Sequence, residues 1–151
     1  MDMQTMTALA KMGGAMALGF SAIGSSLGTG TAGMAGIGAW KKCYAQNKAA
    51  PFILLVFIGA PLSQTIYGML LMNTIVKLSA ETATMWPAMV GAGLIGGIAM
   101  GVSAWYQGKA GAAGCDALGE TGQGFGNYLT TLGVIETVAL FVMIFIQSAL
   151  K

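Results

Sequence analysis

The sequence predicts an all-α membrane protein in which four transmembrane helices form two tandem helical hairpins. Of its 151 residues, 56% are hydrophobic and only 8% are charged, whereas soluble domains carry about 25% charged residues. Four apolar stretches each exceed the length of about 20 residues that a helix needs to cross a bilayer. None of them alternates polar and apolar residues as the strands of a transmembrane barrel do.

The four stretches cover residues 12–39, 52–76, 86–115 and 128–150. The segment before residue 12 lacks the basic start of a secretory signal, because its first charged residue is Asp2. We therefore expect this segment to remain and to lead into the first helix.

The connections between the spans predict how the chain is oriented in the cell membrane. The loops at residues 40–50 and 116–126 lie on the same side, because two spans separate them. The first loop carries Lys41, Lys42 and Lys48, and lysine-rich loops favour the cytoplasmic side. We expect a multi-pass protein of the cell membrane with both loops in the cytoplasm and both termini outside.

Small residues recur at every fourth position in the first and third spans. The rows are Gly24, Gly28, Ala32 and Gly36 in the first span and Gly93, Gly97 and Gly101 in the third. Such rows allow helix backbones to approach closely in lipid. The two spans should therefore pack tightly, either against each other or against copies of themselves.

Several functions are excluded by what the sequence lacks. It contains no histidine, no arginine and only two cysteines, far apart, so a transition-metal site is not expected. A net charge of +2 is too small to indicate a nucleic-acid partner. The segment from Gly28 to Gly33 matches the dinucleotide fingerprint, but that motif needs a preceding strand and a later acidic residue. We therefore expect no organic cofactor.

An internal repeat divides the chain into two halves. Residues 29–36 align with residues 107–114, and the pair Gln64-Thr65 aligns with Glu136-Thr137. The alignment predicts a first hairpin over residues 1–79 and a second over residues 80–151, with the two running parallel. The key position is Gln64 in the first half and Glu136 in the second, so only the second hairpin carries a carboxylate there.

Glu136 lies inside an apolar run and is the centre of the predicted function. A charge near the middle of a span costs roughly 2.5–3.5 kcal/mol on insertion scales. Such residues usually form ion or proton sites. The alternative is a structural glutamate that only hydrogen-bonds a neighbouring helix.

The second span supplies further oxygen atoms. Gln64 and Tyr67 are three residues apart and share one helix face, with Ser63 next to it. Pro61 lacks an amide hydrogen and disrupts the helix before it, and by the helical ladder the freed carbonyl is that of Phe57. Hydroxyl, amide and carboxylate oxygens suit hard cations or protons.

The order of these motifs resembles a known family. Pro61-Leu62-Ser63-Gln64-Thr65-Ile66-Tyr67-Gly68, Gln107-Gly108-Lys109 and Ile135-Glu136-Thr137 together resemble the proteolipid subunit of V-type ATPases. They look most like the K subunit of bacterial sodium-translocating members. The resemblance covers nearly the whole chain. It implies a ring of identical subunits that rotates in the membrane, with ATP hydrolysis carried out by other subunits, so the chain itself is not an enzyme.

The resemblance also implies a sodium site centred on Glu136. The implied ligands are Glu136, Gln64, Gln107, Ser63 and the main-chain carbonyl of Ala60, with Tyr67 as a supporting hydrogen-bond donor. Implied partners are identical subunits, lipid, a membrane stator subunit that supplies a cation, and central-stalk subunits at the two cytoplasmic loops. The chain departs from the expected pattern at Ser63, where threonine is expected, and at the bulky Trp105 and Tyr106.

Three alternatives remain open. The same rotor could carry H⁺, because a carboxyl group in apolar surroundings binds a proton unaided. A small cation-coupled secondary transporter would also use one membrane glutamate, but in its first helix. A purely structural membrane protein would use the glycine rows without needing Glu136. In any of these, we expect Lys109 to lie near the cytoplasmic end of its helix, where it can snorkel.

Overall fold

A computed structural model describes residues 1–150, and all regular structure in that range is helical. Four of its helical segments are long and apolar enough to cross a membrane, which confirms the predicted all-α, four-span fold class of a multi-pass membrane protein. The elements are α1 (Met3–Ala45), α2 (Leu54–Gly59), η1 (Ala60–Leu62), α3 (Ser63–Glu81), η2 (Ala83–Met85), α4 (Trp86–Thr121) and α5 (Phe125–Ala149).

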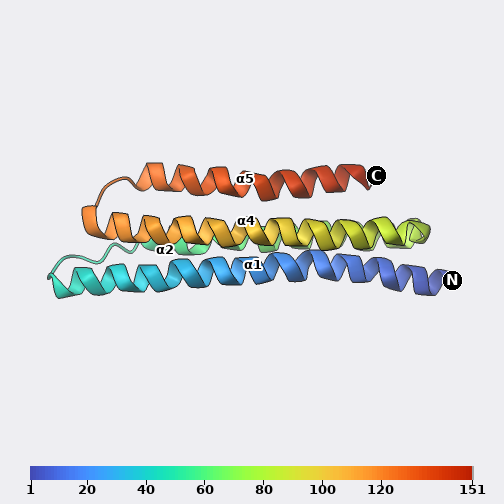
Figure 1. The fold of residues 1–151 in the computed structure, drawn as a ribbon, viewed down its shortest axis with the longest axis horizontal. Helices are drawn as coiled ribbons and strands as arrows, with labels where there is room; N and C mark the ends of the chain where they lie inside the picture. Colours follow the sequence, from blue (N-terminus) through green and yellow to red (C-terminus); the bar gives the residue numbers. More distant parts are fainter. Residues whose placement is uncertain (151) are drawn as a thin grey trace.

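The helices form one elongated bundle (Figure 1). Helices α1 and α4 run side by side in the same direction, and α5 returns along α4. The N- and C-termini lie at one end of the bundle, whereas the α1–α2 and α4–α5 connections lie at the other, which we call the loop end. Both termini therefore lie at one end of the bundle, and both predicted loops lie at the other.

The centre of the bundle is a seam of small residues between α1 and α4. A Cβ atom on Gly24 would overlap the backbone of Gly101, and one on Gly108 would overlap the backbone of Gly28. The first and third spans thus pack against each other with backbone on backbone, as their glycine rows predicted. These paired glycines are 77 and 80 residues apart in the sequence. The internal repeat, which aligns residue 29 with residue 107, has a similar separation of 78 residues.

Helices α1 and α4 both continue past the ends predicted from hydrophobicity. The expected loop at 40–50 is helical to Ala45, and the expected loop at 116–126 is helical to Thr121. Charged residues end an apolar run, but lysine, alanine and leucine still favour helix. Helix α4 stops where Gly122 takes a left-handed conformation with φ of 68°, the usual glycine C-cap.

The first helix also begins earlier than predicted. It starts at Met3, because the side chain of Asp2 accepts a 2.7 Å hydrogen bond from the amide of Thr5. This N-cap satisfies an amide that has no partner within the helix. The same hydrogen bond lowers the pKa of the Asp2 carboxyl group, so the cap persists in mildly acidic conditions.

Two apolar clusters stabilise the ends of the bundle. Toward the loop end, Phe57 and Leu132 pack together, and the Phe57 ring stacks on Phe125 with 5.5 Å between centroids. Toward the termini, Leu71 and Met100 belong to a second cluster. Along α3 and α4 the segment between these clusters holds buried polar residues instead.

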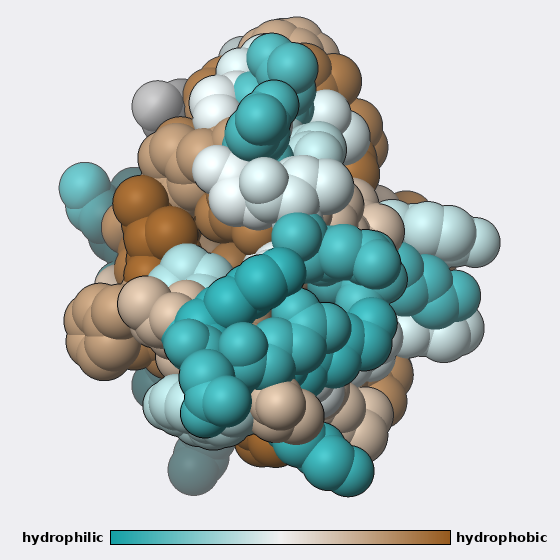
Figure 2. Space-filling model, turned by 90° about the vertical axis from the view of Figure 1, so that its left-hand side faces the viewer, coloured by the Kyte–Doolittle hydropathy of each residue, from teal (hydrophilic) through white to brown (hydrophobic). Residues whose placement is uncertain are grey.

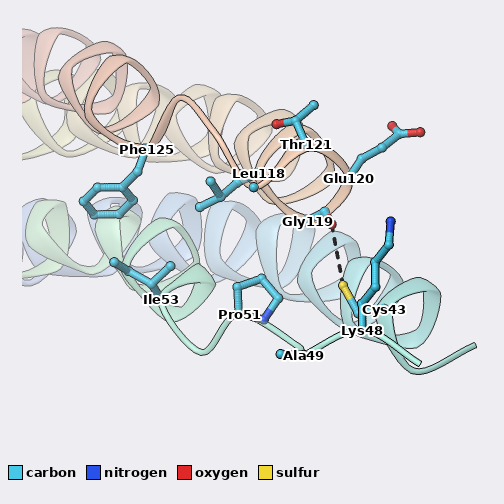
Figure 3. A pocket seen from close by; sticks show the side chains of 11 residues that line it. Cys43, Lys48, Ala49, Pro51, Ile53, Leu118, Gly119, Glu120, Thr121 and Phe125 are labelled. Atoms are coloured by element: carbon cyan, nitrogen blue, oxygen red, sulfur yellow. Dashed lines mark hydrogen bonds between the residues drawn. The ribbon is translucent and has the colours of Figure 1, made fainter. Parts of the chain in front are cut away.

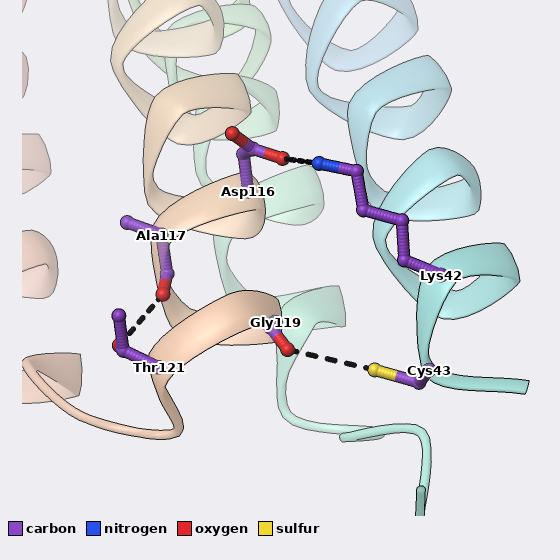
Figure 4. A network of polar contacts seen from close by, with 6 residues as sticks. All are labelled: Lys42, Cys43, Asp116, Ala117, Gly119 and Thr121. Carbon is purple, nitrogen blue, oxygen red and sulfur yellow. Dashed lines mark hydrogen bonds and ion pairs between the residues drawn. The ribbon is translucent and has the colours of Figure 1, made fainter. Parts of the chain in front are cut away.

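Hydrophilic residues gather on the face of the loop end, with hydrophobic residues around them (Figure 2). Here the Nζ atom of Lys42 lies 2.8 Å from Oδ1 of Asp116, and Cys43 donates to the carbonyl of Gly119 (Figure 4). Both side chains of the ion pair are more than half exposed. Exposed ion pairs stabilise a protein by about 1 kcal/mol or less. This ion pair therefore links α1 to α4 but adds little to the stability of the fold.

Lys109 lies in the half of α4 that is nearer the loop end, and its side chain packs on aromatic rings of its own helix. Its Nζ atom lies 4.1 Å from the centroid of the Trp105 ring and 5.0 Å from that of Tyr106. Helical side chains lean toward the N-terminus of their helix, which for α4 is the opposite end of the bundle, and the rings offer a cation–π contact there. Trp105 and Tyr106 are 39% and 55% exposed, so their bulk lies outside the helix packing.

Candidate functional site

Glu136 accepts hydrogen bonds from two different helices. The Tyr67 hydroxyl of α3 donates to its Oε1 atom at 2.6 Å, and Nε2 of Gln107 of α4 donates to its Oε2 atom at 3.1 Å. The carboxylate of Glu136 itself is half-buried on α5. Both partners are donors, so each carboxylate oxygen of Glu136 has a hydrogen bond within the bundle.

Two buried glutamines continue the network into the bundle. Gln64 and Gln107 are both fully buried, and Nε2 of Gln64 donates to Oε1 of Gln107 at 2.8 Å. Nε2 of Gln107 also donates to the carbonyl of Leu132 at 3.0 Å. A buried amide is costly unless it is hydrogen-bonded, and here both amides have partners, which are each other, Ser63, Leu132 and Glu136.

The break at Pro61 supplies the last two groups. Pro61 lies in the short helix η1, between α2 and α3, so the helical ladder is interrupted as its missing amide hydrogen predicts. The Ser63 hydroxyl donates to the carbonyl of Ala60 at 3.0 Å and to Oε1 of Gln64 at 3.2 Å. The structure thus links all six predicted residues in one continuous chain of contacts from Ala60 to Glu136.

These groups together match the needs of a hard monovalent cation. They present one carboxylate, two amide oxygens, one hydroxyl and one main-chain carbonyl, and hard cations prefer oxygen ligands. Rotating the Gln64 amide group by 180° exchanges the positions of its nitrogen and oxygen atoms without moving the backbone. The amide oxygen can therefore face a bound cation. Glu136 is the one acidic residue among these six, so the site carries one negative charge for a cation to neutralise.

Sequence reasoning missed Ser103. Its hydroxyl lies on α4 and donates to the carbonyl of Ile135 at 2.9 Å, next to Glu136 in the chain. The residue is 7% exposed. Its position four residues before Gln107 was a usable signal, because residues i and i+4 share one helix face.

A separate pocket at the loop end does not share this chemistry (Figure 3). It has a volume of about 490 Å³ and is lined by residues that include Cys43, Pro51 and Phe125. Its charged lining residues are Lys48 and Glu120, and neither belongs to the network around Glu136. This pocket is a surface feature of the connections between helices.

The Tyr67 hydroxyl can be tested without reference to any ion. Tyr67→Phe removes the 2.6 Å hydrogen bond to Glu136, a donor to a charged group, which is typically worth about 1.5–3 kcal/mol. Glu136 should then react roughly 10-fold faster with a carbodiimide, which attacks the protonated carboxyl group. The measurement is the labelling rate at fixed pH in detergent. Tyr106→Phe, on the exposed face of α4, should leave the rate unchanged, and equal rates in both variants would contradict the role of Tyr67.

The chain is similar in sequence to subunits of ATP synthases. Residues 90–146 match the family model that describes the C subunit of ATP synthase. The chain is also 32% identical over 133 residues to the A-type ATP synthase subunit K of Methanocaldococcus jannaschii. That alignment covers 88% of this chain and 57% of the relative, so the chain spans little more than half the length of the relative.

Proposed function

From its similarity to the C subunit of ATP synthase and to an A-type subunit K, we propose that this chain is a rotor-ring subunit of a rotary ATPase of the V or A type. In this proposal Glu136 binds Na⁺ and carries it across the membrane. The observation that carries the proposal is the continuous polar network that surrounds one membrane carboxylate with neutral oxygen-bearing groups. The chain performs no hydrolysis, which belongs to other subunits of the complex.

Charge neutralisation provides the mechanism. One Na⁺ on Glu136 gives the site a net charge of about zero, so the occupied site can face lipid. Without the ion, the carboxylate has the cost of a charge in the membrane, roughly 2.5–3.5 kcal/mol. Rotation past lipid therefore requires an occupied site, and the ion leaves only where a cation on a stator subunit replaces it.

Sodium explains the buried glutamines better than a proton does. A carboxyl group in apolar surroundings binds a proton without help, so Gln64, Gln107 and Ser63 would be unnecessary for H⁺ transport. In lipid, buried amides are costly unless they have partners. Their presence around a single carboxylate is accounted for by a cation that needs several oxygen ligands. Proton coupling in the same rotor is the second candidate function.

The proposed assembly follows from the same reasoning. Identical subunits form a ring through the two tandem hairpins, 1–79 and 80–151. The loop end faces the cytoplasm, where the positive residues of the α1–α2 connection lie, and central-stalk subunits contact it. Both termini then face outside. Moving one charge through 100 mV is worth about 2.3 kcal/mol, so hydrolysis of one ATP can drive several ions.

Sodium protection of Glu136 tests the proposal. In the detergent-solubilised ring at fixed pH, Na⁺ should slow carbodiimide labelling of Glu136, because a bound cation competes with the proton that the reagent requires. In Gln64→Leu, which loses one oxygen ligand, about 10-fold more Na⁺ should be needed for equal protection, the ratio that corresponds to a loss of 1.4 kcal/mol. Gln147→Leu is the control, because Gln147 hydrogen-bonds Thr74 and not the network.

The outcome distinguishes sodium transport from proton transport and from a structural role of Glu136. If Na⁺ leaves the labelling rate unchanged and only pH alters it, the site carries protons and the glutamines are packing groups. If neither Na⁺ nor pH alters labelling, Glu136 is structural and the rotor proposal loses its main support.

A further inference from the structure

We infer that Ser103 is a positioning residue that sets the height and rotation of α5 and thereby places the Glu136 carboxylate between Tyr67 and Gln107. Ser103 touches neither carboxylate oxygen. Its hydroxyl instead donates to the main-chain carbonyl of Ile135 at 2.9 Å. The inference rests on the proposed function, since its consequence is a change in ion affinity.

The geometry shows two attachments of α5 to α4. Gln107 donates to the carbonyl of Leu132, and Ser103 donates to the carbonyl of Ile135. These carbonyls belong to the residues four and one before Glu136, so they lie within one helical turn of it. Among residues 1–150, they are the main-chain atoms of α5 that accept a side-chain hydrogen bond from another helix.

Apolar packing is less extensive on α5 than on α4. The buried residues of α5 are Leu132, Ala139 and Met143, with partly buried residues such as Tyr128 and Ile146 beside them, whereas α4 has buried residues along its whole length. Less extensive apolar packing allows a helix to slide and rotate by small amounts, because lipid is as apolar as the groups it would replace. Two directed hydrogen bonds at fixed positions remove that freedom at the level of Glu136.

Ser103 and Gln107 have different roles in holding α5 against α4. One amide hydrogen of Gln107 reaches the Leu132 carbonyl, and the other reaches the carboxylate of Glu136. Gln107 therefore acts on the backbone and on the site at once. Ser103 acts on the backbone alone, so its removal isolates the effect of positioning from the loss of a ligand.

The test compares ion affinity with stability in the assembled ring. Ser103→Ala should raise the Na⁺ concentration that half-protects Glu136 from carbodiimide by about 3- to 15-fold, the range that corresponds to interhelical hydrogen bonds in membranes. Ser103→Thr keeps the hydroxyl and should retain the wild-type affinity. Ser103→Val has the shape of the threonine variant without its hydroxyl and should not. Ser21→Ala is the matched control, because the buried Ser21 hydroxyl bonds only Ala17 of its own helix.

Two results would overturn the inference. One is an unchanged half-protecting concentration in assembled Ala and Val rings. The other is a loss of assembly in the Ala and Val variants while Thr assembles, which would make the hydroxyl a packing element rather than a positioning one. The proposed function fails separately, when the wild-type ring itself shows no protection by Na⁺.

Discussion

Replacing Glu136 with glutamine should abolish sodium binding by the assembled ring. The substitution keeps the shape of the side chain and an oxygen that can accept from Tyr67, but it removes the negative charge. Two unit charges 4 Å apart attract by about 4 kcal/mol at the effective dielectric of a protein, which corresponds to nearly a thousand-fold in affinity. The measurement is equilibrium binding of ²²Na⁺ to purified ring.

The matched control for Glu136→Gln is Glu120→Gln. Glu120 lies in the last turn of α4 at the loop end, where it is exposed, so this variant should bind sodium like the wild type. Retention of stoichiometric sodium binding by Glu136→Gln would show that the glutamines and carbonyl suffice without a charge. The neutralisation mechanism would then be wrong, even if the chain still forms a ring.

A second large effect is expected at the α1–α4 seam. Gly24→Ala places a Cβ atom on the backbone of Gly101, and backbone atoms cannot move aside as a flexible side chain can. Overpacking of this kind typically costs about 1–3 kcal/mol, and the absence of any yielding side chain puts this case at about 3 kcal/mol or more. The variant should therefore yield little folded ring, measured by gel filtration in detergent and by thermal midpoint.

Gly19→Ala is the control for the seam, because a Cβ atom on Gly19 meets no other atom within 4 Å. Alanine favours helix over glycine by up to about 1 kcal/mol, so this variant should be as stable as the wild type or slightly more stable. Equal yields of both alanine variants would show that α1 and α4 do not meet at the seam.

The long-range features of the fold were largely predictable from the sequence. Glycine spacing predicted tight packing of the first and third spans, with the α1–α4 contact as one of two alternatives. Pro61 predicted the break before α3. Both effects follow from local sterics. The internal repeat predicted that the two halves of the chain run parallel to each other. Helix ends were less predictable, since a run of apolar residues indicates the length of a membrane span, whereas α1 continues to Ala45, with Lys42 and Cys43 in contact with α4.

The residues of the candidate site were predictable from the sequence, but the hydrogen bonds between them were not. The six predicted residues came from helix faces and from the family resemblance, and the structure links them as neighbours. The order of donors, in which Gln64 donates to Gln107 and Gln107 to Glu136, depends on side-chain rotation that sequence spacing does not determine. Ser103 was missed because a lone membrane serine most often bonds the carbonyl four residues earlier in its own helix.

The α1–α4 seam also brings two helices closer together than larger interface residues would allow. Glycine sets this spacing at the centre of the bundle, whereas Tyr67 and Glu136 join α3 to α5 through long side chains. In the proposed ring, these helix spacings set the width of one subunit, and the width determines how many copies close a circle. That number would equal the ions carried per revolution, because each copy would carry one ion. The glycines of the seam, which bind no ion themselves, would then help to determine how many ions cross for each ATP.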